Sequence, residues 1–187
     1  MTTFNDLIQT QQVWFSSDHH FGHERVIAYD GRPFQDSEEM DAEMICRWNA
    51  LIGPDDVVVY LGDLSFHKAE RTREIVRALR GNKYLVLGNH DKGRSVTWWK
   101  NAGFLDVWDE QEASFHGTPV QLSHYPYRGK EHDDRTFTRQ LSDKGLPLFH
   151  GHLHTRWTNK GLMVNVGVTQ WSYAPVLLEE VWERLVS

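Results

Sequence analysis

The chain has 187 residues, of which 40% are hydrophobic and 25% charged, and a net charge of −6 with histidine neutral. These values exclude a disordered chain and argue against a general nucleic-acid binder, and they fit one folded domain over residues 1–187. The first twenty residues lack a signal-peptide pattern, and no apolar run is long enough to span a bilayer, so we expect a cytoplasmic protein without a membrane partner.

Strands and helices are predicted to alternate in the first half of the chain and to give way to strands in the second. Apolar, β-prone runs predict strands at 13–17, 57–61 and 83–87, and helical spacing predicts helices from Asp36 onward, near 68–80 and near 95–102. Further short strands are expected at 105–108, 113–115, 120–123, 148–150, 163–166 and 176–179. This order of elements predicts an α/β fold.

The helix that begins at Asp36 has the clearest local signals. Asp36 followed by Glu39 matches a capping box. Its expected buried face consists of Met40, Met44, Ile45, Trp48 and Leu51. Cys46, the single cysteine, lies beside this face and is expected to be a small buried side chain. One cysteine also excludes an internal disulfide and a cysteine-based zinc site.

Five short polar clusters stand at or just beyond the ends of predicted strands. They are Asp18-His19-His20, Gly62-Asp63, Gly88-Asn89-His90-Asp91, Ser123-His124 and Gly151-His152-Leu153-His154. Strand ends gather at one edge of an open α/β sheet, so the clusters are expected to meet there. Asp-x-His and Gly-Asp alone are more typical of an ordinary loop, cap or turn, whereas Gly-Asn-His-Asp and Gly-His-x-His are moderately specific. Packing does not explain all five clusters in this order.

The residue types in these clusters favour metal binding. Carboxylate, imidazole and amide oxygen are ligands that suit manganese, zinc or iron. Seven candidates are present: Asp18, His20, Asp63, Asn89, His124, His152 and His154. One ion needs three or four protein ligands, so seven fit two ions that share a bridging carboxylate. Two such ions are the usual arrangement for in-line attack on phosphorus.

The order of these clusters resembles the calcineurin-like metallophosphoesterase superfamily over residues 13–154. The resemblance implies a four-layer α/β/β/α sandwich of two mixed β-sheets flanked by helices. It also implies two divalent transition-metal ions, with manganese expected first and zinc or iron as alternatives. One ion would be held by Asp18, His20, Asp63 and His154, and the other by Asp63, Asn89, His124 and His152.

The same resemblance assigns roles in catalysis. A hydroxide between the metals would attack phosphorus, and His90 would steady the phosphoryl group and donate a proton to the leaving oxygen. Asp91 is expected to assist by orienting its neighbours through hydrogen bonds. Asn89 would also face the substrate. His23 is expected either near the substrate or at the surface.

Arg128 lies in the long polar stretch 125–145, which has no clear periodicity and suits a functional lid or a disordered loop. The stretch also carries Lys130, Arg135 and Arg139, and we expect Arg128 to be the residue that grips a phosphate. A solvated loop is the alternative interpretation.

The sequence Leu64-Ser65-Phe66-His67 after Gly62-Asp63 lacks the arginine of the superfamily's Ser/Thr protein phosphatases. The chain is instead similar to small bacterial or phage-type members, in which Arg32-Pro33-Phe34 also recurs. We therefore expect hydrolysis of phosphodiesters on a small substrate, such as a nucleotide, and no obligatory protein partner. A phosphomonoesterase, a nuclease that processes nucleic-acid ends and a non-catalytic scaffold remain as alternatives.

Overall fold

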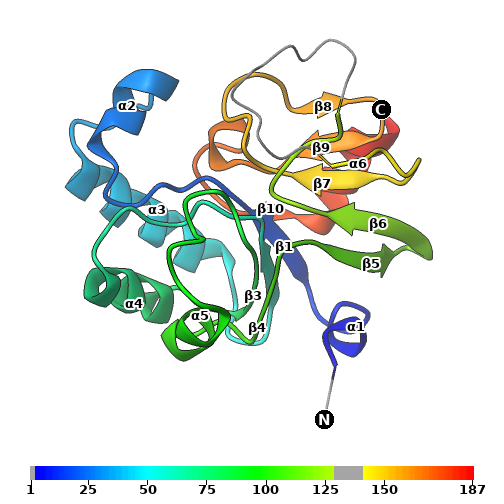
Figure 1. Ribbon diagram of the computed structural model, residues 1–187. Coiled ribbons are helices and arrows are strands. Elements are labelled where there is room, and N and C mark those ends of the chain that lie inside the picture. The colour runs from blue at the N-terminus through cyan, green and yellow to red at the C-terminus, as the bar shows by residue number, and fades with distance from the viewer. Residues whose placement is uncertain (1–2, 129–140) are drawn as a thin grey trace.

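A computed structural model describes residues 3–128 and 141–187. Within them, ten strands form two mixed, five-stranded sheets that are flanked by helices, which confirms the expected α/β architecture (Figure 1). The helices are α1 Phe4–Leu7, α2 Glu24–Asp30, α3 Ser37–Leu51, α4 Ala69–Ala78, α5 Val96–Ala102, the 3₁₀ turn η1 Val168–Gln170, and α6 Leu178–Val186. No helix among the described residues is both long and apolar enough to cross a membrane.

The first sheet has the strand order β10-β1-β2-β3-β4. Its strands are β10 Val176–Leu177, β1 Val13–Ser16, β2 Val57–Tyr60, β3 Asn82–Val86 and β4 Asp106–Trp108. Strands β1 to β4 are mutually parallel, with Ser16 opposite Tyr60 and Tyr60 opposite Leu85. Because these strands run parallel, the loops that follow β1, β2 and β3 leave the same edge of the sheet.

Helices α3, α4 and α5 lie together on one side of the first sheet (Figure 1). Trp48 of α3, Ile75 of α4 and Trp99 of α5 are all buried in one cluster with Val58 and Tyr60 of β2. Helix α3 begins as expected, because the Asp36 side chain accepts a hydrogen bond of 2.8 Å from the backbone N–H of Glu39. The packing of these apolar faces holds the parallel strands in place.

The second sheet has the strand order β5-β6-β7-β9-β8. Its strands are β5 Gln111–Phe115, β6 Thr118–Leu122, β7 Leu148–His150, β9 Met163–Asn165 and β8 Asn159–Lys160. Between the sheets, Phe15 of β1 packs edge-on against Phe149 of β7 and Phe115 of β5, with ring centroids 5.1 and 5.6 Å apart. Strands β6, β7 and β9 are parallel, so the loops after β6 and β7 also share an edge.

Two helices depart from the sequence expectation. Residues 176–179 were expected as a strand, but β10 ends at Leu177 and α6 begins at Leu178. Helix α6 buries Leu178 and Val181 in the core between the sheets, and this burial outweighs the β-prone start of the segment. Helix α2 was not predicted, because its seven residues bury only Val26. Gly31 ends α2 in the left-handed conformation that favours glycine.

Two side chains of α3 also differ from expectation. Cys46 was expected to be buried and is exposed. Leu51 was placed on the buried face, but 45% of its surface is accessible to solvent. Met40, Met44 and Trp48 are fully buried as predicted. The buried face of α3 is therefore narrower than the hydrophobic pattern suggested, and Cys46 and Leu51 lie outside it.

Candidate metal centre

The predicted polar clusters converge from both sheets. Asp18 follows β1, Asp63 follows β2, Asn89 follows β3, His124 follows β6, and the pair His152 and His154 follows β7. Hydrogen bonds join these loops both within the first sheet and between the two sheets. The backbone N–H of Asp18 donates to the Gly62 carbonyl, and the backbone N–H of His152 donates to Asp18 Oδ2 at 2.9 Å.

Asp18, His20 and His154 form one group whose potential ligand atoms lie within 4.8 Å of one another. Asp18 Oδ1 lies 3.6 Å from His154 Nε2 and 3.9 Å from His20 Nε2. The two Nε2 atoms are 3.2 Å apart. At this separation, either one nitrogen donates a proton to the other, or both direct their lone pairs toward a shared cation.

Asp63, His124 and His152 form a second group within the same 4.8 Å limit. Asn89 joins them, because its Oδ1 lies 3.1 Å from His124 Nε2. Asp63 also connects the two groups. Its Oδ2 lies 3.4 Å from His124 Nε2 and 3.8 Å from His20 Nε2. This position suits a carboxylate that bridges two ions.

The backbone of these residues is unusual. Asp18, His20, Asp63, His152 and His154 all have positive φ angles, between 46° and 70°. Residues other than glycine rarely adopt this left-handed conformation, and it clusters at functional sites where the surrounding structure enforces it. This backbone strain falls on five of the six residues that form the two groups, which favours a functional reason for their placement.

Gly88 permits the close approach of the loops after β2 and β3. A Cβ atom at this position would overlap the backbone nitrogen and the Oδ1 atom of Asp63. Asp91 then holds the two loops together. Its fully buried carboxylate accepts hydrogen bonds from the backbone N–H groups of Asp63 at 2.7 Å, Gly88 at 2.9 Å and Leu64 at 3.1 Å. Asp91 therefore positions Asp63 and does not reach the open site.

The charges of the site are set by burial and by one ion pair. Burial opposes ionisation of Asp63, but the adjacent His124 outweighs it and lowers the pKa of that carboxyl. Burial also acts to lower the pKa of His124, but Asp63 raises it to about 9. Burial lowers the pKa of His20 well below its ordinary value, and burial together with the charge of His124 lowers that of His152 to about 3. His20 and His152 are therefore neutral and can offer lone pairs.

One buried oxygen atom, Asp18 Oδ1, indicates whether a cation fits in the first group. Asp18 has no accessible surface, and burial raises the pKa of its carboxyl. Among the described residues, its Oδ1 atom has no hydrogen-bond partner. A buried carboxylate oxygen without a donor is costly. An ion between Asp18, His20 and His154 would satisfy it, so the donor set fits a divalent transition metal.

Asp30 is a site residue that the sequence reasoning missed. Its Oδ2 atom lies 2.7 Å from His154 Nδ1, and its Oδ1 atom lies 3.0 Å from the same nitrogen. Because a carboxylate can only accept, this contact fixes a His154 proton on Nδ1 and leaves Nε2 as the nitrogen that can bind a cation beside Asp18. Arg32, whose side chain is fully buried, donates to Asp30 Oδ2 at 3.0 Å and to the backbone carbonyls of Asp18 and His19 at 2.9 and 2.8 Å.

The two groups open into a hollow of about 290 Å³. It is lined by His20, His23, Val26, Tyr29, Asp30, Asp63, Asn89, His90, His152 and His154. His90 donates its backbone N–H to Asp63 Oδ1 at 2.9 Å, while 44% of its side chain is exposed. His90 can therefore meet a bound molecule while its backbone is fixed to Asp63. His23 also lines the hollow, whereas the sequence had left a position at the surface as an alternative.

Comparison with known proteins places the chain among phage and archaeal relatives. The gene 66 protein of Mycobacterium phage D29 is 32% identical over 92% of this chain and 95% of its own length. The chain belongs to the same family. Protein MJ1445 of Methanocaldococcus jannaschii is also 32% identical, over 90% of this chain and 88% of its own. No protein-family model matches the sequence.

Solved structures extend the comparison to the fold of the chain. The protein of unknown function AQ665 from Aquifex aeolicus aligns over 93% of the chain and 99% of its own, with a TM-score of 0.71 and 23% identity. That likeness supports the two-sheet fold. A novel archaeal phosphodiesterase aligns over 84% of the chain and 82% of its own, with a TM-score of 0.47 and 16% identity, which is too distant to assign an activity.

Arg128, expected to grip a phosphate, is exposed and does not line the hollow. Its backbone N–H donates to the Leu141 carbonyl at 3.0 Å. Lys130, Arg135 and Arg139 of the same predicted loop lie outside the described residues. The described structure therefore supplies no contact that brings Arg128 to the candidate metal centre.

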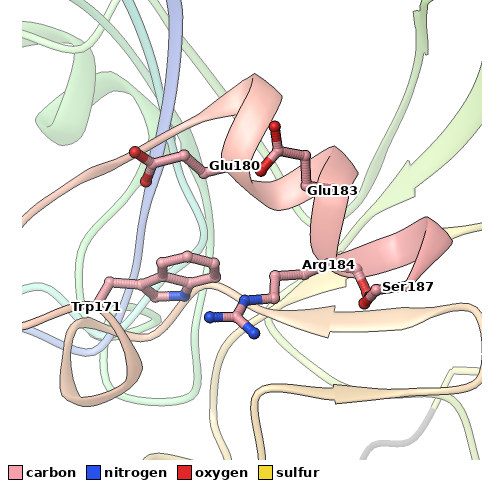
Figure 2. Close-up of a pocket in the computed structure, with 5 residues that line it drawn as sticks. All are labelled: Trp171, Glu180, Glu183, Arg184 and Ser187. Atoms are coloured by element: carbon pink, nitrogen blue, oxygen red, sulfur yellow. The ribbon is translucent and has the colours of Figure 1, made fainter.

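A second hollow, of about 460 Å³, shares no lining residue with the candidate metal centre. Figure 2 shows Trp171 and Arg184 side by side next to α6, and the guanidinium lies 5.9 Å from the centre of an indole ring. Glu180, Glu183 and Ser187 complete its lining. This set contains no histidine, and neither of its glutamates belongs to the two candidate metal groups found among the described residues.

Proposed function

We propose that the chain is a metal-dependent phosphoesterase that uses two divalent ions and hydrolyses small phosphodiesters. The convergence of the two ligand groups on Asp63 is the observation that carries this proposal. The order of the same residues along the chain, which resembles the calcineurin-like superfamily, also supports it. When bound, the ions would supply positive charge for the phosphoryl oxygens and lower the pKa of the attacking water.

The protein's own residues would hold and orient the ions. One ion would be bound by Asp18, His20, Asp63 and His154, and the other by Asp63, Asn89, His124 and His152. Manganese is the ion we propose first, since nitrogen and oxygen ligands suit it, with zinc or iron as alternatives. Asp91 positions the bridging carboxylate through the backbone of its loop, and Asp30 orients His154.

His90 is the proposed proton donor for the leaving oxygen. Its side chain is partly exposed at the hollow, while Asp63 fixes its backbone. General acid catalysis of this kind contributes roughly 10²- to 10⁴-fold to the rate. Loss of His90 should therefore slow hydrolysis of esters with poor alkoxide leaving groups more than hydrolysis of activated aryl esters.

The lining of the hollow favours a diester over a monoester. Among the described residues that line it, none is arginine or lysine. A phosphomonoester carries up to two negative charges and is usually gripped by a guanidinium, whereas a diester carries one. The volume of about 290 Å³ is at the small end of ligand sites, which supports a small substrate.

A reconstitution experiment tests the proposal. Protein stripped of metal would be reloaded separately with Mn²⁺, Zn²⁺, Ni²⁺ or Mg²⁺ and assayed on bis-aryl and mono-aryl phosphates that release the same phenol. We expect metal-dependent turnover with a preference for the diester. Faster turnover of the monoester would favour a phosphomonoesterase. Tight metal binding without turnover of any ester would favour a non-catalytic scaffold.

A further inference from the structure

Part of the hollow has no role in holding metal. Val26 and Tyr29 lie on α2, and His23 immediately precedes that helix. Tyr29 is 72% exposed, the highest value among the large hydrophobic side chains of the described residues. A single exposed aromatic residue is ordinary, but Tyr29 lines the hollow that contains the candidate ligands.

Phe66 supplies a second aromatic surface near the same opening. It is 41% exposed, and its ring stacks on that of His23 with centroids 4.0 Å apart and an interplanar angle of 17°. The Phe66 ring also lies 4.6 Å from that of His90 and 5.2 Å from that of His20. Aromatic rings therefore form a continuous series from the proposed proton donor to the start of α2.

The site thus combines two chemistries within one small volume. Carboxylates and imidazoles gather around Asp63, where a phosphate would be bound by metal. Partly exposed rings and the aliphatic side chain of Val26 lie beside them. Aromatic side chains at a solvent-exposed opening favour binding of planar rings, because stacking of two rings buries the apolar face of each. Contact with solvent does not explain why these aromatic side chains lie next to the candidate metal ligands.

We propose that Tyr29, His23 and Phe66, together called the aromatic rim, bind a planar ring carried by the phosphate ester. This inference rests on the proposed phosphoesterase function and narrows its substrate class to aryl or nucleoside esters. Loss of one stacking partner typically weakens binding of a base about 5- to 150-fold. Tyr29 is the best residue to remove, because none of the ring contacts seen at the candidate ligands involves it.

The test uses calorimetry to measure how tightly three phosphate monoesters bind to the metal-loaded protein, and product analysis after each titration verifies that the ester is intact. Methyl phosphate reports the metal-bound phosphate alone. Phenyl phosphate and thymidine 5′-phosphate add an aryl ring and a nucleoside, and so distinguish the two sources of a planar ring. We expect wild type to bind at least one of these two ligands about 5- to 150-fold more tightly than methyl phosphate.

Tyr29→Ala and Tyr29→Leu should remove most of this preference without changing the affinity for methyl phosphate. Leu105→Ala, at a residue that is 51% exposed and does not line the hollow, should retain it. Phe66→Leu provides a test at a second position and should also reduce the preference. Circular dichroism would verify that each variant is folded.

Equal affinity of wild type for ring-bearing and methyl phosphates would overturn the aromatic rim, and so would an unchanged preference in both Tyr29 variants. In either case, metal-dependent hydrolysis of phosphate esters would leave the proposed function standing. Failure of the metal-loaded protein to bind any phosphate and to hydrolyse any ester would overturn both.

Discussion

Replacement of Asp30 by asparagine tests whether His154 is prepared as a metal ligand. The Asp30 carboxylate lies 2.7 Å from His154 Nδ1 and 3.0 Å from a guanidinium nitrogen of Arg32. Loss of such a carboxylate partner typically lowers metal affinity 10- to 100-fold. That change corresponds to about 1.4–2.7 kcal/mol of binding free energy at 25 °C.

The expected effect on stability follows from mass action. A metal present at 100 times its dissociation constant stabilises the wild-type fold by about 2.7 kcal/mol. At the same metal concentration, an affinity that is 10- to 100-fold weaker leaves only about 0.4–1.4 kcal/mol in the Asp30→Asn variant. Urea denaturation with and without Mn²⁺ measures this difference for each protein. Comparing each protein with its own metal-free form removes the separate cost of losing the Arg32 contact.

Asp41→Asn is a matched control. Asp41 is also a buried aspartate beside a histidine, with its Oδ2 atom 2.6 Å from His67 Nε2. His67 belongs to neither ligand group. Asp41→Asn should therefore leave metal affinity unchanged. An Asp30→Asn variant that binds Mn²⁺ as tightly as wild type, or an Asp41→Asn variant that loses as much affinity, would refute the reasoning.

Two further predictions concern stability. Asp91→Ala leaves three buried backbone N–H groups without their acceptor, so it should lower the free energy of unfolding by about 3–5 kcal/mol. A urea midpoint close to that of wild type would contradict this role. Burial lowers the pKa of Lys83 below its ordinary value of 10.5, so the unfolded chain holds this proton more tightly than the folded protein does. The free energy of unfolding should therefore increase as the pH rises toward 10.5. Lys83→Met removes this pH dependence. The free energy of unfolding of the variant minus that of wild type should therefore decrease between pH 8 and 10.5. A difference that stays constant over this range would contradict the prediction.

Much of the architecture could be predicted from local patterns. The run Val57–Tyr60 is apolar at every position because both faces of β2 are covered, and Asp36 begins α3 by accepting a hydrogen bond from Glu39. The start of α6 could also have been found. Leu178, Val181, Trp182 and Leu185 recur at helical spacing, and this pattern extends beyond the short β-prone run at 176–177.

Some residues of the candidate site could likewise be predicted from the sequence, and others could not. The clusters around Asp18, Asp63 and His154 were recognisable because strand ends meet at one edge of a sheet. Asp30 was not, because it lies 124 residues from His154 along the chain and no motif joins them. Tyr29 was missed for a related reason, since an exposed tyrosine carries no pattern until α2 places it at the hollow. Contacts made by tertiary packing alone leave little trace in one sequence.

Metal stoichiometry is the measurement that tests the central proposal most directly. Native mass spectrometry of protein reloaded with Mn²⁺ should find two ions per chain. Asp18→Asn should lose one of them, and Asp63→Asn should weaken both, because Asp63 lies between the two groups. Absence of tight binding in wild type, or two ions retained in both variants, would contradict a dinuclear centre built on Asp63.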